Sequence, residues 1–348
     1  MKRIVLCCDG TWNRADQAQD GVPCPTNVLR LAYRVAKRDP DGIAQVVFYD
    51  QGVGTGNCVD RLTGGAFGAG LEDNILDAYR FLIANFEPGD DLFLFGFSRG
   101  AYTARSLAGM IRKCGILARR HVKQYVPASR LYRHPDIHPD DKEAAEFRAC
   151  HSCCGSDPIP IKCIGVWDTV GALGIPMRGL RSLTRRRHRF HDTELSGTVE
   201  HAFHALAIDE RRSPFEPTLW LEKPKPNQLV SQTWFPGVHS DVGGGYASTD
   251  LSDITLRWMM DNASLAGLHW ADEVISSAPL SGNPVGTLHD SKTGLYRFTT
   301  GAARPMSHAR SETVHPSALD RWDRVPSYRP RNLQAFLRSI GDARADRH

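Results

Sequence analysis

The chain has 348 residues, of which 41% are hydrophobic and 24% are charged, and its formal net charge is +4. A chain of this length and composition can bury a substantial core, as one large α/β domain or two ordinary ones. The small, dispersed positive charge argues against recognition of nucleic acid. We therefore expect a globular protein with no nucleic-acid partner.

The N-terminal sequence and the cysteines indicate the compartment. The chain reaches Asp9 too soon for a secretory signal, and no apolar run is long enough to cross a membrane. Nine cysteines, an odd number in a chain of this size, favour reduced thiols over a disulfide framework. We expect a soluble cytoplasmic protein, with export by a signal-independent secretion system as the alternative.

Residues 1–114 alternate between strand and helix patterns. Short apolar runs predict strands at 2–8, 45–49 and 91–95, and helical spacing predicts helices at 26–36, 71–85 and 99–114. This alternation is typical of a mostly parallel sheet with helices on both faces. The glycine-rich segment 64–70 is expected to be a flexible loop, with a mobile lid as the alternative.

The pattern loosens in the rest of the chain, which we expect to belong to the same single domain, 1–348. Residues 115–160 show no clean strand period and are expected to form an inserted cap or lid. The Arg-rich stretch 178–190 is expected to be a solvated loop, or else a surface that meets anionic phospholipid headgroups. The spacing of 200–211 fits either a helix or a strand. Further strands are predicted at 161–167, 228–235 and 296–300, and helices at 253–266 and 332–340.

Residues 96–100, Gly-Phe-Ser-Arg-Gly, match the G-x-S-x-G pattern of a nucleophile elbow. They lie between an apolar strand and a helix, which is the context that the motif requires. A side chain at Gly96 or Gly100 is expected to clash, since the turn brings the backbone close to both elements. Ser98 is then exposed at the strand end, beside the positive end of a helix dipole. The alternative is a tight turn with an ordinary capping serine.

A serine nucleophile needs a histidine to take its proton and an acid to orient that histidine. Asp168 ends one predicted strand and His239 follows another, and sites in parallel sheets lie at the carboxyl ends of the strands. The chain order Ser98, Asp168, His239 is that of the α/β-hydrolases. The alternatives are His315 for the base and Asp209 or Asp241 for the acid.

The tetrahedral oxyanion of such a reaction needs two backbone N–H donors. Arg99, the residue after the nucleophile, is one expected donor, and Gly10 or Thr11 after the first strand is the other. The loop around the histidine is expected to bend closely around the site because it is rich in glycine. Its supporting residues are Gly243, Gly244 and Asp241, the last through backbone hydrogen bonds.

Five blocks, in order along the chain, resemble the catalytic domain of type VI secretion lipase effectors: CDGTWN (8–13), GFSRGA (96–101), VWDTVG (166–171), HALAIDE (204–210) and GVHSDVGGGY (237–246). The block ETVHPS (312–317) extends the match. The resemblance implies an α/β-hydrolase fold, a triad of Ser98, Asp168 and His239, and phospholipase activity on ester bonds. By the same analogy, an immunity protein is a candidate partner.

The sequence thus predicts a serine hydrolase that cleaves carboxylic esters of phospholipids or other lipids through an acyl-enzyme, without a cofactor or a metal. A small-molecule esterase or thioesterase is the alternative. Two non-hydrolase alternatives rest on weaker motifs. Glycines at 52–56 suggest a nucleotide-binding module, but no phosphate-binding Lys-Ser/Thr follows. Cysteines at 150–154, with Cys163, suggest a zinc site, but a second cysteine pair is missing.

Overall fold

The computed structural model describes residues 1–10, 17–19, 21–52, 64–171, 195–220, 224–293, 301–307 and 311–346. Its centre is a parallel sheet with strand order β4-β1-β5-β6-β7-β8-β9. These strands are β1 (Arg3–Cys8), β4 (Gln45–Asp50), β5 (Asp91–Phe97), β6 (Ile161–Trp167), β7 (Val199–Ala207), β8 (Leu229–Phe235) and β9 (Glu312–Val314). A small antiparallel pair, β2 (Ala18–Gln19) and β3 (Val22–Pro23), lies outside this sheet. The α/β class predicted from the sequence is confirmed.

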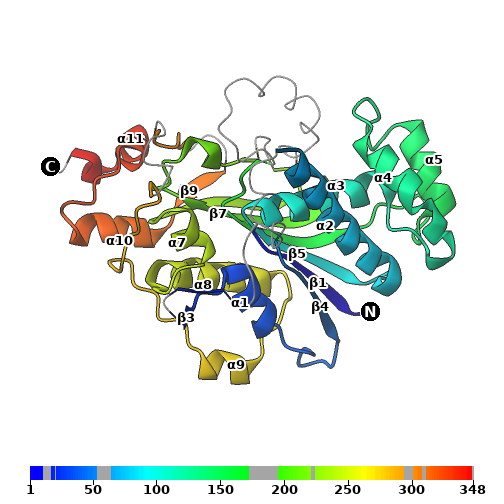
Figure 1. Cartoon of the computed structure of the whole chain (residues 1–348), viewed down its shortest axis with the longest axis horizontal. Helices are drawn as coiled ribbons and strands as arrows, with labels where there is room; N and C mark the ends of the chain where they lie inside the picture. The colour runs from blue at the N-terminus through cyan, green and yellow to red at the C-terminus, as the bar shows by residue number, and fades with distance from the viewer. Residues whose placement is uncertain are drawn as a thin grey trace.

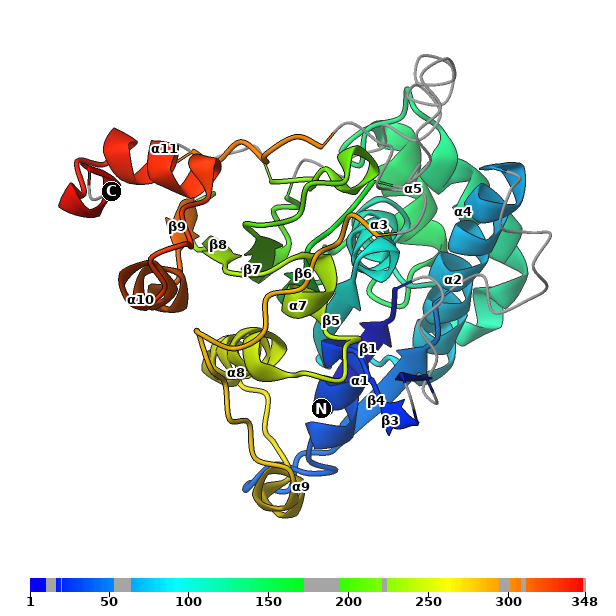
Figure 2. The same ribbon diagram turned by 60° about the vertical axis from the view of Figure 1, so that its left-hand side comes forward.

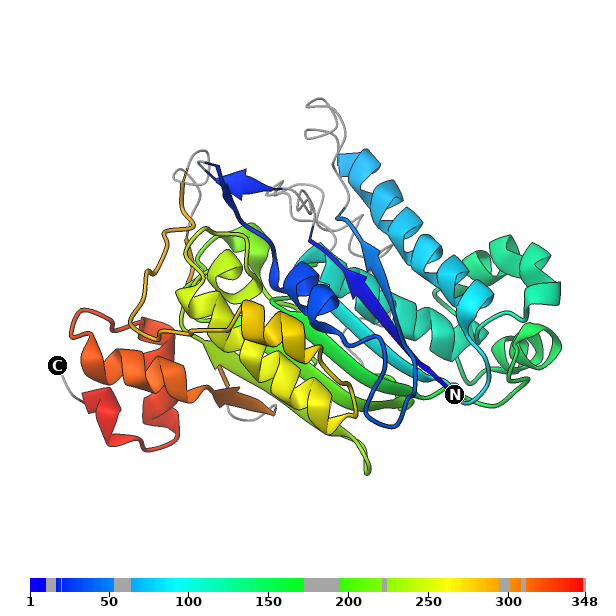
Figure 3. The same ribbon diagram turned by 90° about the horizontal axis from the view of Figure 1, so that it is seen from below.

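Helices cover both faces of the sheet, because successive side chains of a strand point to opposite faces and both sets are apolar here. Ile4 and Leu92 pack with helices α2 (Gly64–Asn85) and α3 (Arg99–Cys114). Val5 and Phe93 pack on the other face, with α1 (Asn27–Arg34) and α8 (Asp250–Leu265). Figure 1 shows α2 and α3 above the sheet and α1 and α8 below it. Figure 3 brings α1 and α8 in front of the sheet.

Smaller helices flank the sheet at its two ends. The 3-10 helix η2 (Arg119–Gln124), α4 (Tyr125–Arg133) and α5 (Lys142–His151) lie at one end, and α10 (Pro316–Arg324) and α11 (Arg331–Ser339) lie at the other (Figures 1 and 2). The remaining short helices are η3 (Ser213–Phe215), α7 (His239–Gly243), α9 (Asp272–Ser277) and η5 (Ala343–Asp346). Within the described ranges, no helix combines the length and the apolar character that a membrane span requires.

The glycine-rich segment 64–70 was expected to be a loop or a lid, and that expectation is wrong. Residues 64–70 form the first turns of α2, continuous with the helix predicted from residue 71. Glycine disfavours a helix by about 1 kcal/mol per residue. Once a helix has nucleated, however, each added residue contributes another hydrogen bond, so the long helix extends back through the glycines.

The undecided stretch 200–211 is a strand, β7, in the middle of the sheet. Its residues 202–207 are all buried, so helices on both faces remove the alternation by which a half-exposed strand is recognised. Strand β9 and helix α10 were not predicted, since β9 has three residues and is too short to show a period. The strand expected at 296–300 and the Arg-rich stretch 178–190 lie outside the described residues, as do most of the glycines at 52–56.

The insertion at 115–160 is helical and packs on α3 at the end opposite Ser98. Arg148 of α5 donates to the carbonyls of Lys113 and Pro139, and the thiol of Cys114 donates to the carbonyl of Ala128 in α4. Because α3 starts at Arg99, directly after Ser98, and ends at Cys114, these contacts lie at the far end of the helix. The insertion therefore supports the C-terminal end of α3 rather than covering the turn at Ser98.

Candidate active site

The turn at Ser98 joins β5 to α3 with a backbone geometry that few residues adopt. Ser98 has φ 57° and ψ −119°, a strained conformation that persists only where the surroundings enforce it. A Cβ on Gly96 would lie 2.4 Å from the carbonyl oxygen of Gly100, and a Cβ on Gly100 would lie 2.1 Å from that of Cys8. Only glycine fits at these two positions. Ser98 lies at the carboxyl edge of the sheet, but it is buried, 6% exposed, so the expectation of an exposed serine is wrong. The turn packs too closely against the end of β1, where Gly100 approaches the carbonyl of Cys8, to leave the serine open.

Asp168 follows β6, the strand beside β5, and it is fully buried. Its Oδ2 lies 2.5 Å from Nδ1 of His239, the first residue of α7. Strands β6 and β8 end at the same edge of the sheet because all strands run parallel. The two side chains thus meet although 71 positions separate them.

Two aromatic rings hold the imidazole of His239. The ring of Phe97 lies 4.6 Å from it, centroid to centroid, and the ring of Phe215 meets it edge to face at 4.9 Å. Phe97 immediately precedes Ser98, so the imidazole lies next to the turn that carries the hydroxyl. Such packing fixes the ring orientation on which a proton transfer depends.

The carboxylate of Asp168 also binds a residue that no motif indicated, Arg304. The guanidinium donates to both oxygens, from one terminal nitrogen to Oδ1 at 2.6 Å and from the other to Oδ2 at 2.9 Å. The N–H of Ala207 donates to Oδ1 as well, at 3.1 Å. Burial by itself would raise the pKa of Asp168, but the charge of Arg304 and the hydrogen bonds from His239 and Arg304 hold that pKa well below its ordinary value.

Glu210 supports His239 from the backbone side. Its Oε2 accepts the N–H of His239 at 3.3 Å, and its carboxylate pairs with Arg212 at 2.8 Å. Burial would raise the pKa of Glu210, but the hydrogen bond and charge of Arg212 lower it to about 2. Burial lowers the pKa of His239, and Asp168 and Glu210 offset part of that shift. The shifts thus favour ionised carboxylates and a neutral imidazole.

The alternative residues for the acid and the base form hydrogen bonds with other partners. Asp209 accepts from the N–H of Gly237 and the hydroxyl of Tyr328. Asp241 accepts from the N–H of Val238 and faces Nδ1 of His289 at 2.6 Å, so it organises the loop through the backbone. His315 caps α10 by accepting from the N–H of Ser317, and its ring stacks on Phe235. In the structure, the imidazole of His239 pairs with Asp168 rather than with Asp209 or Asp241.

Two of the expected oxyanion donors, Arg99 and Gly10, lie at the neighbouring ends of α3 and β1. Arg99 is the first residue of α3, and the close approach of Gly100 to Cys8 brings the end of β1 against the start of that helix. The N–H of Gly10 donates to Oδ1 of Asp9 at 2.7 Å. Thr11 lies outside the described residues. Asp9, for which the sequence predicted no role of its own, also accepts from the hydroxyls of Thr26 and Tyr49 and so anchors the end of β1.

Gly243 and Gly244, in the loop that follows His239, lie in close contact with neighbouring elements. A Cβ on Gly243 would lie 2.0 Å from Cε2 of Phe97. Gly244 has φ +81°, and a Cβ there would lie 2.7 Å from the backbone nitrogen of Asn27. The loop predicted after β8 is thus partly a short helix, α7, pressed against β5 on one side and α1 on the other.

The cysteines of the zinc alternative are spread over two elements. Cys163 is buried inside β6, while Cys150 is exposed on α5. The sulfur atoms of Cys153 and Cys154 lie 3.9 Å apart. In the part of the chain that the structure describes, no three His, Cys, Asp or Glu side chains are grouped as metal ligands.

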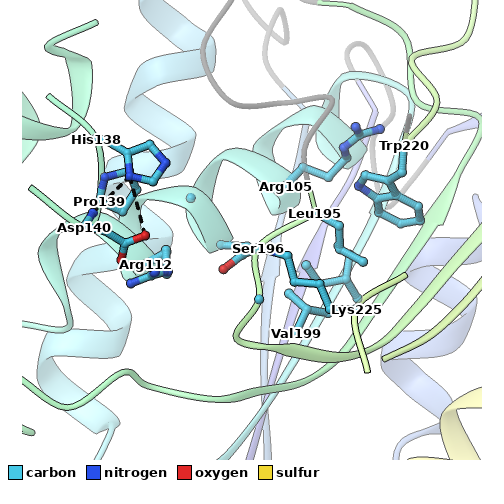
Figure 4. A pocket seen from close by; sticks show the side chains of 14 residues that line it. Arg105, Arg112, His138, Pro139, Asp140, Leu195, Ser196, Val199, Trp220 and Lys225 are labelled. Atoms are coloured by element: carbon cyan, nitrogen blue, oxygen red, sulfur yellow. Dashed lines mark hydrogen bonds and ion pairs between the residues drawn. The ribbon is translucent and has the colours of Figure 1, made fainter. Parts of the chain in front are cut away.

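A pocket of about 100 Å³ lies elsewhere on the molecule, between the second half of α3 and the start of β7. Figure 4 shows Arg105 and Arg112 lining it, with Trp220 and Leu195 among its apolar residues. Arg105 lies over the ring of Trp220, and Arg112 pairs with Asp140. Arg105 and Arg112 come from the part of α3 that leads away from Ser98, and none of Ser98, Asp168 and His239 lines this pocket.

Residues 2–262 match the family described as "T6SS, Phospholipase effector Tle1-like, catalytic domain". The chain belongs to this family of type VI secretion system (T6SS) phospholipase effector catalytic domains. Arg304 and the helices α10 and α11 lie beyond the matched residues.

Three similar proteins match this chain over only part of their own length. "Uncharacterized protein YEL023C" of Saccharomyces cerevisiae is 31% identical over 255 residues, which is 67% of this chain and 35% of the relative. An uncharacterized protein from Pseudomonas aeruginosa has the same fold, with a TM-score of 0.50, 20% identity, and coverage of 78% of this chain and 47% of that one. The Tle1 effector bound to the VgrG spike aligns with a TM-score of 0.37 and 19% identity, over 71% of this chain and 52% of that one. The chain spans about a third of the curated relative and about half of each solved chain.

Proposed function

We propose that the chain is a serine esterase that hydrolyses lipid esters, with Ser98 as nucleophile, His239 as base and Asp168 as the acid that orients the base. The observation that carries this proposal is the 2.5 Å contact between Nδ1 of His239 and Oδ2 of Asp168, beside the strained turn at Ser98. This contact directs the other ring nitrogen, Nε2, away from the carboxylate and leaves it for the hydroxyl.

The proposed reaction has two halves. Oγ of Ser98 attacks the ester carbonyl while Nε2 of His239 takes the hydroxyl proton. The tetrahedral intermediate collapses, the C–O bond to the alcohol breaks, and His239 returns the proton to that alcohol. Water then gives a proton to His239 and attacks the acyl-enzyme, which releases the fatty acid and restores Ser98.

The oxyanion of the intermediate would be held by backbone donors at the start of α3 and the end of β1. Arg99 follows the nucleophile, where the N–H faces the developing charge in an elbow of this type. Gly10 and Thr11 are the proposed sources of the second donor. Because the N–H of Gly10 donates to Asp9 at present, its use would require that bond to give way to the oxyanion.

Phospholipids are the substrate class that we propose. The family description names phospholipase effectors, which supports a lipid ester over a soluble one. The same description names type VI secretion, and by analogy with effectors of that system an immunity protein is the macromolecular partner that we propose.

The test is labelling with a fluorophosphonate probe, which reacts with activated serines. We expect wild-type protein to be labelled and Ser98→Ala to be unlabelled. Ser106→Ala is the matched control, because Ser106 is a buried serine of the same helix, 5% exposed. Labelling that persists in Ser98→Ala would contradict the assignment of the nucleophile.

The substrate class is tested by comparing phosphatidyl lipids in vesicles with short-chain soluble esters. Release of fatty acid from the phospholipids is the expected result. If only the short esters are cleaved, the lipid proposal fails and the small-molecule esterase alternative replaces it.

A further inference from the structure

The buried guanidinium of Arg304 contacts two of the residues that support His239, Asp168 and Phe215. Besides the two bonds to Asp168, its terminal nitrogens donate to the carbonyls of Ala207, at 2.9 Å, and Phe215, at 2.5 Å. Phe215 is the residue whose ring meets the imidazole edge to face. Arg304 is 4% exposed, so these bonds are shielded from water.

The position of Arg304 in the chain makes this contact long-range. Arg304 lies 136 positions after Asp168, in the described segment 301–307, and beyond the residues that match the family. A planar guanidinium that binds both oxygens of a carboxylate fixes its rotation as well as its position. A lysine could supply the charge but not the two-point contact.

We propose that Arg304 is a positioning residue of the esterase: it holds the carboxylate of Asp168 at the rotation in which Oδ2 faces His239. The inference rests on the proposed roles of Ser98, Asp168 and His239. Arg304 does not touch the reacting atoms and acts through Asp168. In addition, its charge limits the negative field that the carboxylate exerts on the imidazole.

The sign of the electrostatic effect follows from the charges around His239. Two buried ion pairs surround it, Asp168 with Arg304 and Glu210 with Arg212. On its own element, Asp241 is paired with His289. Removing the charge of Arg304 leaves Asp168 with an uncompensated negative charge, which favours the imidazolium. The pKa of His239 should therefore rise, and a higher pH should be needed for activity.

The experiment measures the rate of fluorophosphonate labelling against pH in wild type, Arg304→Gln and Arg321→Gln. Arg321 is the matched control, since it is 6% exposed and its guanidinium donates to the carbonyls of Pro284 and Gly286 rather than to Asp168. We expect Arg304→Gln to move the midpoint of the profile up by about one pH unit. Its plateau rate should fall by about tenfold to a hundredfold, the range seen when a group that orients a metal-binding side chain is lost. Arg321→Gln should keep the wild-type profile.

The outcomes separate this inference from the proposed function. If wild-type protein is not labelled at Ser98, the esterase itself is wrong. If wild type is labelled and folded Arg304→Gln has the same midpoint and plateau, Arg304 is only structural. Should Arg304→Gln not fold, Arg304→Lys decides, because it keeps the charge and loses the two-point contact. If the labelling profile of Arg304→Lys keeps its midpoint and its plateau rate falls about tenfold, the positioning role is supported. If its plateau rate equals that of wild type, the positioning role is overturned.

Discussion

The backbone of Gly243 lies against the ring of Phe97, at a distance where a Cβ on Gly243 would come within 2.0 Å of Cε2. Phe97 precedes Ser98, and Gly243 ends the helix that begins at His239. The contact therefore ties the proposed nucleophile to the proposed base through one ring and one glycine. No other residue type fits between them.

Gly243→Ala should reduce both stability and activity. The added methyl group must displace Phe97, and overpacking of this kind costs about 1–3 kcal/mol of unfolding free energy. The displaced ring also contacts His239, so the labelling rate of Ser98 should fall by more than tenfold, since small misplacements at a reacting centre cost about that much or more. Urea unfolding and fluorophosphonate labelling measure the two effects.

Gly109→Ala is the matched control for this substitution. Gly109 lies inside α3, and the nearest atom to an added Cβ is Cε2 of Tyr132 at an ordinary 3.5 Å. Alanine favours a helix over glycine by about 1 kcal/mol, so this variant should be more stable than wild type with unchanged labelling. A loss of labelling in both variants would show that the effect of Gly243→Ala does not depend on Phe97.

Asp168→Asn should abolish most of the activity. An amide cannot stabilise the imidazolium and favours the wrong tautomer, which in serine hydrolases of this kind lowers kcat by about 10,000-fold. Asp209→Asn and Asp241→Asn should each lose less than about tenfold, because neither carboxylate contacts the imidazole. Steady-state hydrolysis of an ester by the three variants gives the comparison. A loss in Asp241→Asn equal to that in Asp168→Asn would transfer the acid role to Asp241.

Activity should rise with pH and reach half of its plateau below pH 6.5. His239 accepts a proton only when it is neutral, and burial lowers its pKa from the ordinary 6.5, although Asp168 and Glu210 offset part of the shift. The labelling rate from about pH 4.5 to about pH 8.5 measures this limb directly. A midpoint clearly above 6.5 would mean that the two carboxylates outweigh burial.

Asp209 should make folding less favourable as the pH rises. Burial raises its pKa from 3.8 to about 6, although bonds from Gly237 and Tyr328 lower it in part. The folded state thus holds a proton that the unfolded chain releases, so stability is lost between about pH 4 and about pH 6 and stays low above that range. Asp209→Asn lacks this titration. Relative to wild type, its unfolding free energy should increase by up to about 3 kcal/mol from pH 4 to pH 7, as urea unfolding at the two pH values would measure.

The control for Asp209→Asn is Asp320→Asn on α10, where the carboxylate is exposed and pairs with Arg324. An exposed pair of this kind contributes little, so its variant should follow wild type at both pH values. If Asp209→Asn also follows wild type, the carboxyl of Asp209 is not desolvated in the folded protein.

The local sequence determined the order of the strands and helices up to the end of α3 and the position of the elbow. Helix α3 has the bounds that the sequence predicted, and Gly96 and Gly100 mark a turn that no larger residue could form. These features depend on neighbours within a few positions, which is why apolar spacing and glycine reveal them. The same patterns failed at β7, whose two covered faces hide the strand period, and at 64–70, where a long helix overrode its glycines.

Only the tertiary structure decided which side chains meet. Asp168, Asp209 and Asp241 all follow strands at the same edge of the sheet, and the sequence favoured Asp168 but left the other two open. The choice depends on the rotation of each side chain and on the partners that the fold supplies, with Asp168 facing His239 and Asp209 facing Tyr328. The contact of Arg304 with Asp168 is the clearest example of a contact that the sequence did not predict. It lies in a segment without a motif, and folding brings its charge onto the buried carboxylate of Asp168, because an ionised carboxylate in a protein interior needs a nearby cation and full hydrogen bonding.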